Sequence, residues 1–259
     1  MTGHPRTSAA DLMTIGNGLC GFLAIAVLAN LWLEPGDPAA GLDHDTLIAC
    51  LLLYGIGMVF DVLDGPVARW RGSSGLGSVL DPICDTITFG LLPALLLIAS
   101  VHDDTSWRDP TVFACAAYVG TSILRLARHA MAEARQPVRP EFSGMPSPVG
   151  GNCILAMVVL SPPAPVAALG AVVVASLLVA DFPYPNKRSL GGVFVAVLLA
   201  ASFAGIAGLI SLDIPAVMAL VGLLPIAIVR VVSGWVHAAA ALLAARHAAP
   251  VGLGHDGHR

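Results

Sequence analysis

Long apolar runs separated by short polar connectors fill most of the chain. Eight of them can be delimited, at roughly 12–33, 46–69, 77–101, 110–132, 147–161, 164–181, 190–211 and 214–236. A helix needs about 20 apolar residues to cross a bilayer, and most of the runs approach this length. The pattern predicts an all-α fold, a polytopic membrane helix bundle of about eight transmembrane helices. Because the fifth run is short and ends at SPPAP, it can form a tight hairpin with the sixth, and six or seven spans remain alternatives.

The composition supports a membrane protein. The chain of 259 residues is 56% hydrophobic and only 12% charged, and its mean hydropathy is +0.82. Soluble domains are usually about 25% charged. The five cysteines lie singly in apolar segments and form no CxxC pair. We interpret them as small buried hydrophobic residues. We expect membrane lipids around the protein and no nucleic acid as a partner.

Basic residues are concentrated on alternate connectors. One set of connectors and ends carries most of them: Arg69, Arg71, Arg128, Arg135, Arg139, Lys187, Arg188, Arg246 and Arg259. Since Lys and Arg favour the cytoplasmic side of a membrane, both termini and the connector near residue 73 are predicted to be cytoplasmic. The expected organisation is a cytoplasmic segment at 1–11, one transmembrane domain at 12–246 and a disordered cytoplasmic tail at 247–259.

Four aspartates interrupt the second and third apolar runs, in the stretch DVLDGPVARWRGSSGLGSVLDPICD at 61–85. An aspartate at the centre of a membrane helix costs about 2.5–3.5 kcal/mol on insertion scales. Asp61 and Asp64 are three residues apart, and Asp81 and Asp85 are four apart, so each pair shares one helical face. The short connector makes the two helices antiparallel neighbours. All four carboxylates are therefore predicted to share one level, in a cavity open to the cytoplasm.

Four carboxylates in one pocket repel each other unless cations balance them. Hard divalent ions with oxygen ligands, Mg²⁺ or Mn²⁺, are the favoured cations. Two other interpretations are weaker: structural ion pairs, and the ion path of a cation-coupled transporter. Transporters place ionisable groups near the bilayer midplane on broken helices of paired repeats, whereas these acids lie on one hairpin at one membrane face.

Written out, the stretch is D-x2-D-G-x2-A-R-x7-G-x3-D-x3-D. It resembles the signature of the CDP-alcohol phosphatidyltransferase family, with every position matched. The resemblance implies an integral membrane enzyme of phospholipid biosynthesis with a six-helix catalytic core, usually assembled as a homodimer. Its reaction transfers the phosphatidyl group of CDP-diacylglycerol to an alcohol and releases CMP.

The same resemblance implies roles for the motif residues. Asp61, Asp64 and Asp81 would hold two divalent metal ions, and Asp85 would complete the second metal site and act as the base on the alcohol. Small residues would leave room for the nucleotide of the CDP-lipid, and a guanidinium would meet its phosphates. These residues are Gly65, Ala68, Gly77 and Arg69.

Four further stretches are similar to the membrane-type phosphatidylserine synthases of this family. They are TIGNGLCGFLAIA, ILRLARHAMAE, FSGMPSPVGGN and DFPYPNKR, which follow one another between residues 14 and 188. The similarity implies L-serine as the acceptor. The chain departs from the subfamily pattern at His129 and Ala130, where that pattern has Phe and Asn. Inositol phosphate, glycerol phosphate or another alcohol therefore remain alternatives.

Three residues are candidates for binding the acceptor. Arg125 and Arg128 end the fourth run on the predicted cytoplasmic side, and a guanidinium binds a carboxylate such as that of serine well. They can instead be there because basic residues mark cytoplasmic helix ends. Ser147, in GMPSP, is placed to touch a ligand, although this loop can also be only a turn.

Overall fold

The structure is a computed structural model, and it describes residues 7–33, 41–72, 74–135, 141–143, 145–180 and 183–185. The seventh and eighth predicted spans, at 190–211 and 214–236, lie outside these described residues. The predicted tail at 247–259 lies outside them as well. The total of eight spans and the six-helix core therefore stay predictions.

Helices form nearly all of the described part of the chain. They are α1 (Ala9–Leu33), α2 (His44–Arg71), α3 (Gly77–Asp85), the π-helix η1 (Thr86–Leu91), α4 (Leu92–Ser100), α5 (Arg108–Arg135), α6 (Ser147–Leu160) and α7 (Ala164–Val179). Within this part, four helical stretches are long and apolar enough to cross a membrane: Ala9–Asn30, His44–Arg71, Gly77–Ser100 and Arg108–Ala132. The first four predicted spans are thus confirmed as membrane-length helices.

The fifth apolar run forms a short helix, as predicted, and the sixth also forms a helix shorter than the first four spans. α6 has 14 residues and α7 has 16. They are joined by a tight turn in which Ser161 adopts a left-handed conformation with φ 43°. Ser161 donates its backbone N–H to the carbonyl of Met157, which closes the last turn of α6.

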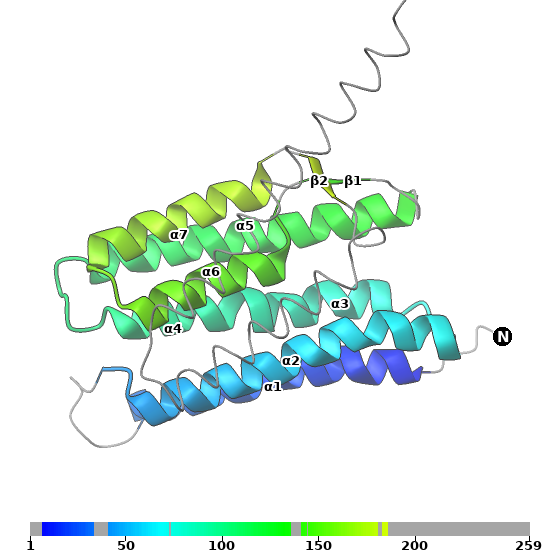
Figure 1. Cartoon of the computed structure of the whole chain (residues 1–259), viewed down its shortest axis with the longest axis horizontal. Helices are drawn as coiled ribbons and strands as arrows, with labels where there is room; N and C mark the ends of the chain where they lie inside the picture. Colours follow the sequence, from blue (N-terminus) through cyan, green and yellow to red (C-terminus); the bar gives the residue numbers. More distant parts are fainter. Residues whose placement is uncertain are drawn as a thin grey trace, which may run out of the picture.

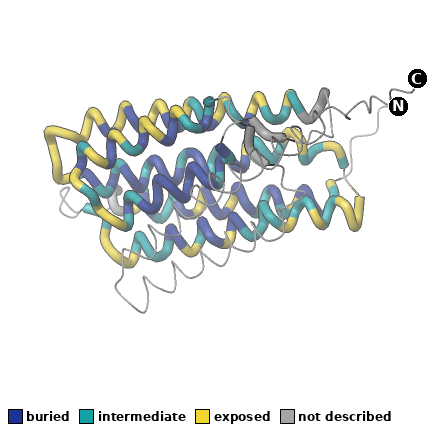
Figure 2. The backbone as a smooth tube through the Cα atoms, turned by 45° about the horizontal axis from the view of Figure 1, so that its top comes forward, coloured by how far each residue is buried: buried dark blue, intermediate teal, exposed yellow. Residues whose placement is uncertain are grey.

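The helices pack in layers along a common direction (Figure 1). α1 and α2 form one pair and α5 and α7 another, while the continuous helix of α3, η1 and α4 runs between them beside α6. In the most apolar 18-residue stretch of this continuous helix, 61% is buried, against 33–39% in the corresponding stretches of the other three membrane-length helices. Figure 2 accordingly shows the buried residues concentrated in the middle of the bundle. The helix carrying two of the four motif aspartates is therefore the central one.

A short antiparallel β-pair was not predicted. β1 (Glu141–Ser143) follows α5, β2 (Pro183–Pro185) follows α7, and Phe142 pairs with Tyr184. Strands of three residues are too short for an alternating pattern to stand out in a sequence. The pair links the connectors after α5 and α7 at the end of the bundle that the basic residues predict to be cytoplasmic.

Glycines allow α1 to approach the central helix closely. A Cβ atom on Gly21 would lie 2.5 Å from Oγ1 and 2.9 Å from Cα of Thr88, and one on Gly18 would lie 2.8 Å from Sγ of Cys84. Such separations exclude any larger residue unless the helices move apart. Because α1 lies so close to the central helix, the side chain of Asn17 on α1 can donate a hydrogen bond to Asp85.

Candidate functional site

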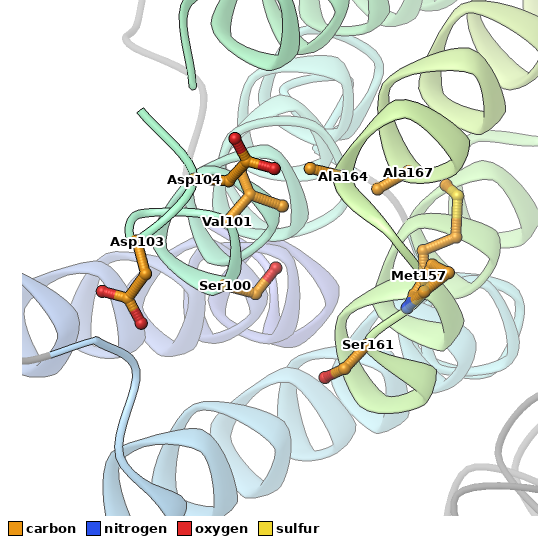
Figure 3. A pocket seen from close by; sticks show the side chains of 9 residues that line it. Ser100, Val101, Asp103, Asp104, Met157, Ser161, Ala164 and Ala167 are labelled. Atoms are coloured by element: carbon orange, nitrogen blue, oxygen red, sulfur yellow. The ribbon is translucent and has the colours of Figure 1, made fainter. Parts of the chain in front are cut away.

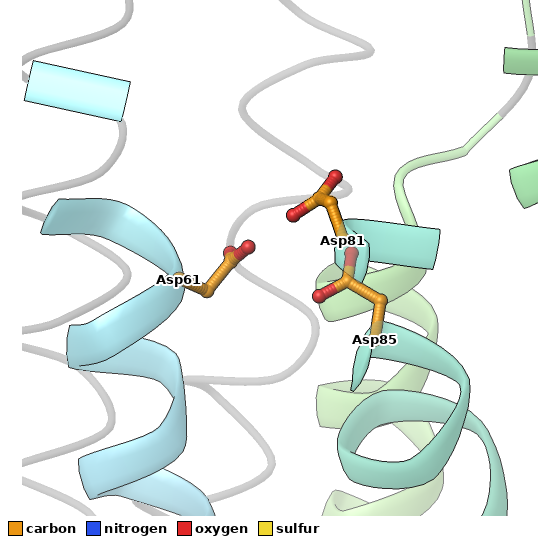
Figure 4. Close-up of side chains that lie close together, drawn as sticks. All are labelled: Asp61, Asp81 and Asp85. Carbon is orange, nitrogen blue, oxygen red and sulfur yellow. The ribbon is translucent and has the colours of Figure 1, made fainter. Parts of the chain in front are cut away.

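Three motif aspartates converge between α2 and α3. Asp61, Asp81 and Asp85 each offer a carboxylate oxygen, and these oxygens all lie within 4.8 Å of one another. Figure 4 shows the Asp61 side chain directed across the gap toward the other two. Asp61 and Asp81 are half-buried, and Asp85 is only 6% exposed. We call these three residues the carboxylate cluster.

The connector between α2 and α3 sets this arrangement. Gly72 and Gly75 have φ angles of 91° and 82°, in the region that glycine tolerates and other residues rarely adopt. A Cβ atom at either position would meet nothing within 4 Å. The glycines are thus needed for backbone conformation and not for space, and the chain reverses within five residues. The two helices of this hairpin run in opposite directions (Figure 1), and α1 packs against both of them.

The fourth aspartate of the motif has a different partner. Asp64 lies one turn after Asp61 on α2, and its Oδ2 accepts a hydrogen bond of 2.8 Å from Oγ1 of Thr14 on α1. It is not among the three residues whose oxygens converge within 4.8 Å. The structure thus brings together three of the four predicted metal ligands and places Asp64 beside them, nearer the end of the helix.

Asp85 is held by a neighbouring helix. Nδ2 of Asn17 on α1 donates a hydrogen bond of 3.0 Å to Oδ1 of Asp85, and both residues are buried. Thr14 and Asn17 belong to the stretch TIGNGLCGFLAIA, which indicated only a subfamily, and their contacts with Asp64 and Asp85 were not predicted. Asp11, Thr14 and Asn17 recur every third residue in the first half of a largely apolar helix, and this spacing is the signal from which a polar face could have been predicted.

A π-helix begins directly after Asp85. In η1 the turn is one residue wider than in an α-helix, and the N–H of Leu92 donates to the carbonyl of Ile87. Two hydrogen bonds join this segment to other helices: Thr88 of η1 donates to the backbone carbonyl of Asn17 on α1 at 2.9 Å, and Tyr118 of α5 donates to the carbonyl of Phe89 at 2.6 Å. Such wide turns are frequent at functional sites. Hydrophobic periodicity gave no sign of it.

The residues predicted to meet the nucleotide lie around the end of the same hairpin. Gly65 and Ala68 on α2 and Gly77 at the start of α3 are half-buried, and Arg69 is exposed. A Cβ atom on Gly65 would meet only Nη1 of Arg69, at 3.5 Å. The guanidinium therefore lies over Gly65, one turn from Asp64, where a phosphate can reach it.

Two of the three predicted acceptor residues contact each other. Nη1 of Arg125 on α5 donates a hydrogen bond of 2.8 Å to Oγ of Ser147, the first residue of α6. Ser147 is fully buried, so its hydroxyl orients the guanidinium and does not face an open cavity. Arg125 is half-buried, while Arg128, one turn later, is exposed.

A second acidic region lies at the opposite end of the bundle. A cavity of about 170 Å³ is lined by the ends of α4 and α6 and the start of α7 (Figure 3). Asp103 and Asp104 border it from the loop after α4, and both are exposed. Ser100, at this end of the central helix, is about 22 Å from Asp85 at 1.5 Å per residue. This cavity is separate from the carboxylate cluster.

Comparison with known proteins gives a consistent result. A family model described as CDP-alcohol phosphatidyltransferase matches residues 7–245. A CDP-diacylglycerol–serine O-phosphatidyltransferase of Bacillus subtilis is 29% identical over 180 residues, covering 68% of this chain and 89% of that protein. One of Methanocaldococcus jannaschii is 30% identical over 158 residues (60% and 73%). An archaetidylserine synthase of Methanothermobacter thermautotrophicus is 27% identical over 185 residues (70% and 71%).

Proposed function

Because the chain belongs to the CDP-alcohol phosphatidyltransferase family, we propose that it transfers the phosphatidyl group of CDP-diacylglycerol, or an analogous CDP-lipid, to the hydroxyl of L-serine. The products are the phosphatidylserine-type lipid and CMP. The names of the similar proteins support serine as the acceptor, and both diacyl and archaeal lipids occur among those names. The observation that carries the chemistry is the convergence of Asp61, Asp81 and Asp85.

The carboxylate cluster fits a pair of hard divalent cations. Its ligands are all carboxylate oxygens, the type that Mg²⁺ and Mn²⁺ take in proteins. Three such groups with oxygens within 4.8 Å repel one another in a half-buried site unless cations balance them. Asp61, Asp81 and Asp85 would hold the ions, together with Asp64 from the next turn. When bound, two divalent ions stabilise the charge on the attacking and leaving oxygens of a phosphoryl transfer.

The chain's own residues supply the remaining steps. Asp85, fixed at one oxygen by Asn17, takes the proton of the serine hydroxyl. The hydroxyl oxygen forms a bond to the phosphorus of the phosphatidyl group, and the pyrophosphate bond to CMP breaks. Gly65, Ala68 and Gly77 pack against the nucleotide, and Arg69 meets its phosphates.

Arg125 is the residue best placed to recognise the acceptor's carboxylate. Its guanidinium is half-buried and held by the buried hydroxyl of Ser147, so it is presented in a defined orientation. A charge-assisted hydrogen bond to a carboxylate is strong and directional. Arg128, one turn nearer the helix end, is exposed and adds positive charge there. An acceptor that carries a carboxylate is thus favoured over a neutral alcohol.

The setting of the reaction follows from the helices. The four membrane-length helices make this an integral membrane protein, and the acyl chains of the CDP-lipid stay in the bilayer. The basic residues around the α2–α3 connector support an active site on the cytoplasmic face. One transmembrane domain at 12–246 carries out the reaction, in a homodimer.

An acceptor screen tests this function. Purified full-length protein in detergent is given labelled CDP-diacylglycerol, Mn²⁺ or Mg²⁺, and one alcohol at a time: serine, inositol phosphate, glycerol phosphate, choline or ethanolamine. We expect CMP and a new lipid with serine, and no turnover after EDTA. Product with a polyol phosphate and none with serine would contradict the acceptor, and metal-independent turnover would contradict the role of the cluster. Solute flux in vesicles without CMP release would favour the transporter instead.

A further inference from the structure

α1 carries three buried polar residues on one face, each bonded to the hairpin that bears the motif. Asp11, Thr14 and Asn17 are three residues apart and are 1%, 2% and 0% exposed. Ser74 of the connector donates to Asp11 at 2.6 Å, Thr14 donates to Asp64 at 2.8 Å, and Asn17 donates to Asp85 at 3.0 Å. We call these three residues the α1 ladder. It contacts the hairpin at its connector, at α2 and at α3.

Packing alone does not account for the α1 ladder. A threonine inside an apolar helix can satisfy its hydroxyl on its own helix, and Thr14 does contact the carbonyl of Ala10 at 3.2 Å. The shorter contact of its hydroxyl, however, is to Asp64. A buried asparagine costs free energy unless its polar atoms are bonded, and the amide of Asn17 is directed at Asp85. Both side chains thus interact with the motif's carboxylates.

The chemistry of the two donors suits a metal site. Asp61, Asp81 and Asp85 repel one another, so without restraint their side chains would rotate apart. A lysine or arginine could restrain them but would also neutralise the charge that attracts a cation. A neutral amide or hydroxyl fixes one carboxylate oxygen and leaves the negative charge in place. A carboxylate has two oxygens, so one can be held while the other serves the site.

Asn17 is coupled to the central helix at two points. Its side chain donates to Asp85, and its backbone carbonyl accepts from Thr88, one turn later in η1. The absence of a side chain on Gly18 and Gly21 permits this proximity. α1 therefore restrains both the carboxylate of Asp85 and the π-helix that follows it.

We propose that α1 positions the metal ligands of the hairpin, with Asn17 holding Asp85 and Thr14 holding Asp64 in the orientation that binds divalent ions. Both are positioning residues, because they act through the carboxylates. This inference rests on the proposed function, since it concerns the same metal site. Removing such an outer partner of a metal ligand typically costs about 10–100-fold in metal affinity.

Binding of Mn²⁺ tests the inference without turnover. Full-length protein in detergent, without CDP-lipid, is titrated with Mn²⁺, and the free ion is measured by electron paramagnetic resonance. Thr14→Val keeps the shape of the side chain and removes the hydroxyl, while Thr14→Ser keeps the hydroxyl. We expect Thr14→Val and Asn17→Leu each to weaken Mn²⁺ binding by about 10–100-fold and Thr14→Ser to bind nearly as wild type. The spectrum of the bound ion should also change in Asn17→Leu.

A matched control separates positioning from loss of stability. Thr111 on α5 is also fully buried, but its hydroxyl donates to the carbonyl of Trp107 in its own turn. Thr111→Val should therefore bind Mn²⁺ as wild type does, whatever its melting temperature. Wild-type affinity in folded Thr14→Val would overturn the role of Thr14, and wild-type affinity in folded Asn17→Leu would overturn that of Asn17. If wild-type protein itself bound no Mn²⁺, the metal-dependent function would fail as well, so the two failures are distinguishable.

Discussion

The two acidic regions of this molecule differ in how their carboxylates are held. In the carboxylate cluster the acids come from two helices, lie partly or fully buried, and Asp85 is fixed by a third helix through Asn17. At the opposite end, Asp103 and Asp104 lie next to each other in one exposed loop. The side chain of Asp103 is 81% exposed, and its contact with His102 is 3.6 Å long. Only the first arrangement imposes a geometry on its charges.

The loop acids have local structural partners instead. Oδ1 of Asp104 accepts from the backbone N–H groups of Ser106 and Trp107, each at 3.2 Å, as acids in turns before a helix do. They border a cavity of about 170 Å³, but a cavity with acids at its edge does not make a site. A cluster that converges from separate elements and is restrained by neutral donors does suggest one.

The largest expected difference between the two regions is in turnover. Asp85→Asn preserves shape and can still meet Asn17, but a neutral amide cannot take the proton of the acceptor's hydroxyl. A general base contributes about 10²–10⁴-fold to the rate, so CMP release should fall by that amount. Asp104→Asn, the matched change in the other region, should turn over as wild type does. Equal rates in the two variants would remove Asp85 from the reaction.

Metal affinity is the next contrast. Asp61→Asn removes one charge from the cluster, and we expect weaker binding of Mn²⁺ and of CDP-diacylglycerol together. Removing an outer partner of a metal ligand typically lowers metal affinity by about 10–100-fold, and losing the ligand itself should lower it at least as much. Asp64→Asn is the informative comparison, because Asp64 lies beside the three convergent residues. An Asp64→Asn variant that binds Mn²⁺ as tightly as wild type would restrict the metal ligands to the carboxylate cluster. Titration of each variant with Mn²⁺ and with CDP-diacylglycerol measures the two affinities.

Recognition of the acceptor should depend on one arginine more than on its neighbour. Losing a hydrogen bond to a charged group costs about 1.5–3 kcal/mol, which corresponds to roughly 10–150-fold in affinity. Arg125→Ala should raise the KM for serine by this factor and change the KM for CDP-diacylglycerol less. The exposed Arg128 should give a smaller effect in the same direction, and so should Ser147→Ala, which removes the partner that orients Arg125. A larger effect of Arg128→Ala would reverse the assignment.

The sequence predicted those parts of the site that depend on local spacing. Aspartates three and four residues apart, joined by a short connector, had to share faces of neighbouring helices, and three of them converge as expected. The partner of Asp64 was not predictable in this way, because Thr14 lies 50 residues earlier and only packing brings it there. For the same reason the burial of Ser147 under Arg125 was missed.

Irregular local structure was also beyond prediction. A π-helix after Asp85 differs from an α-helix by one residue per turn, and the apolar pattern of Leu92–Ser100 continues without a visible break. The three-residue strands β1 and β2 carry no periodicity. The membrane-length helices, by contrast, follow directly from hydropathy, since a bilayer requires long apolar segments.

The smallest expected effect concerns Asp43, on the same side of the bundle as Asp103. It caps α2, since Oδ1 of its side chain accepts from the backbone N–H of Thr46 at 2.9 Å. This hydrogen bond lowers the pKa of the Asp43 carboxyl below its ordinary value. The stabilisation is therefore present above about pH 3.9, the ordinary pKa of an aspartate, and is lost as the pH falls through the lowered pKa of the folded state.

Replacing this cap tests whether the two ends of the molecule act independently. Asp43→Ala should lower the free energy of unfolding by about 0.5–2 kcal/mol at neutral pH, while Asp43→Asn, which keeps an acceptor oxygen, should lose less and should not weaken as acid is added. Thermal unfolding between neutral pH and about pH 3 measures both, since the carboxyl titrates there. Neither variant should change Mn²⁺ affinity, because Asp43 precedes α2 and Asp61 lies about 27 Å further along at 1.5 Å per residue. A loss of Mn²⁺ affinity as large as that of Thr14→Val would mean that α2 transmits changes along its length, so the two ends of the molecule would not act independently.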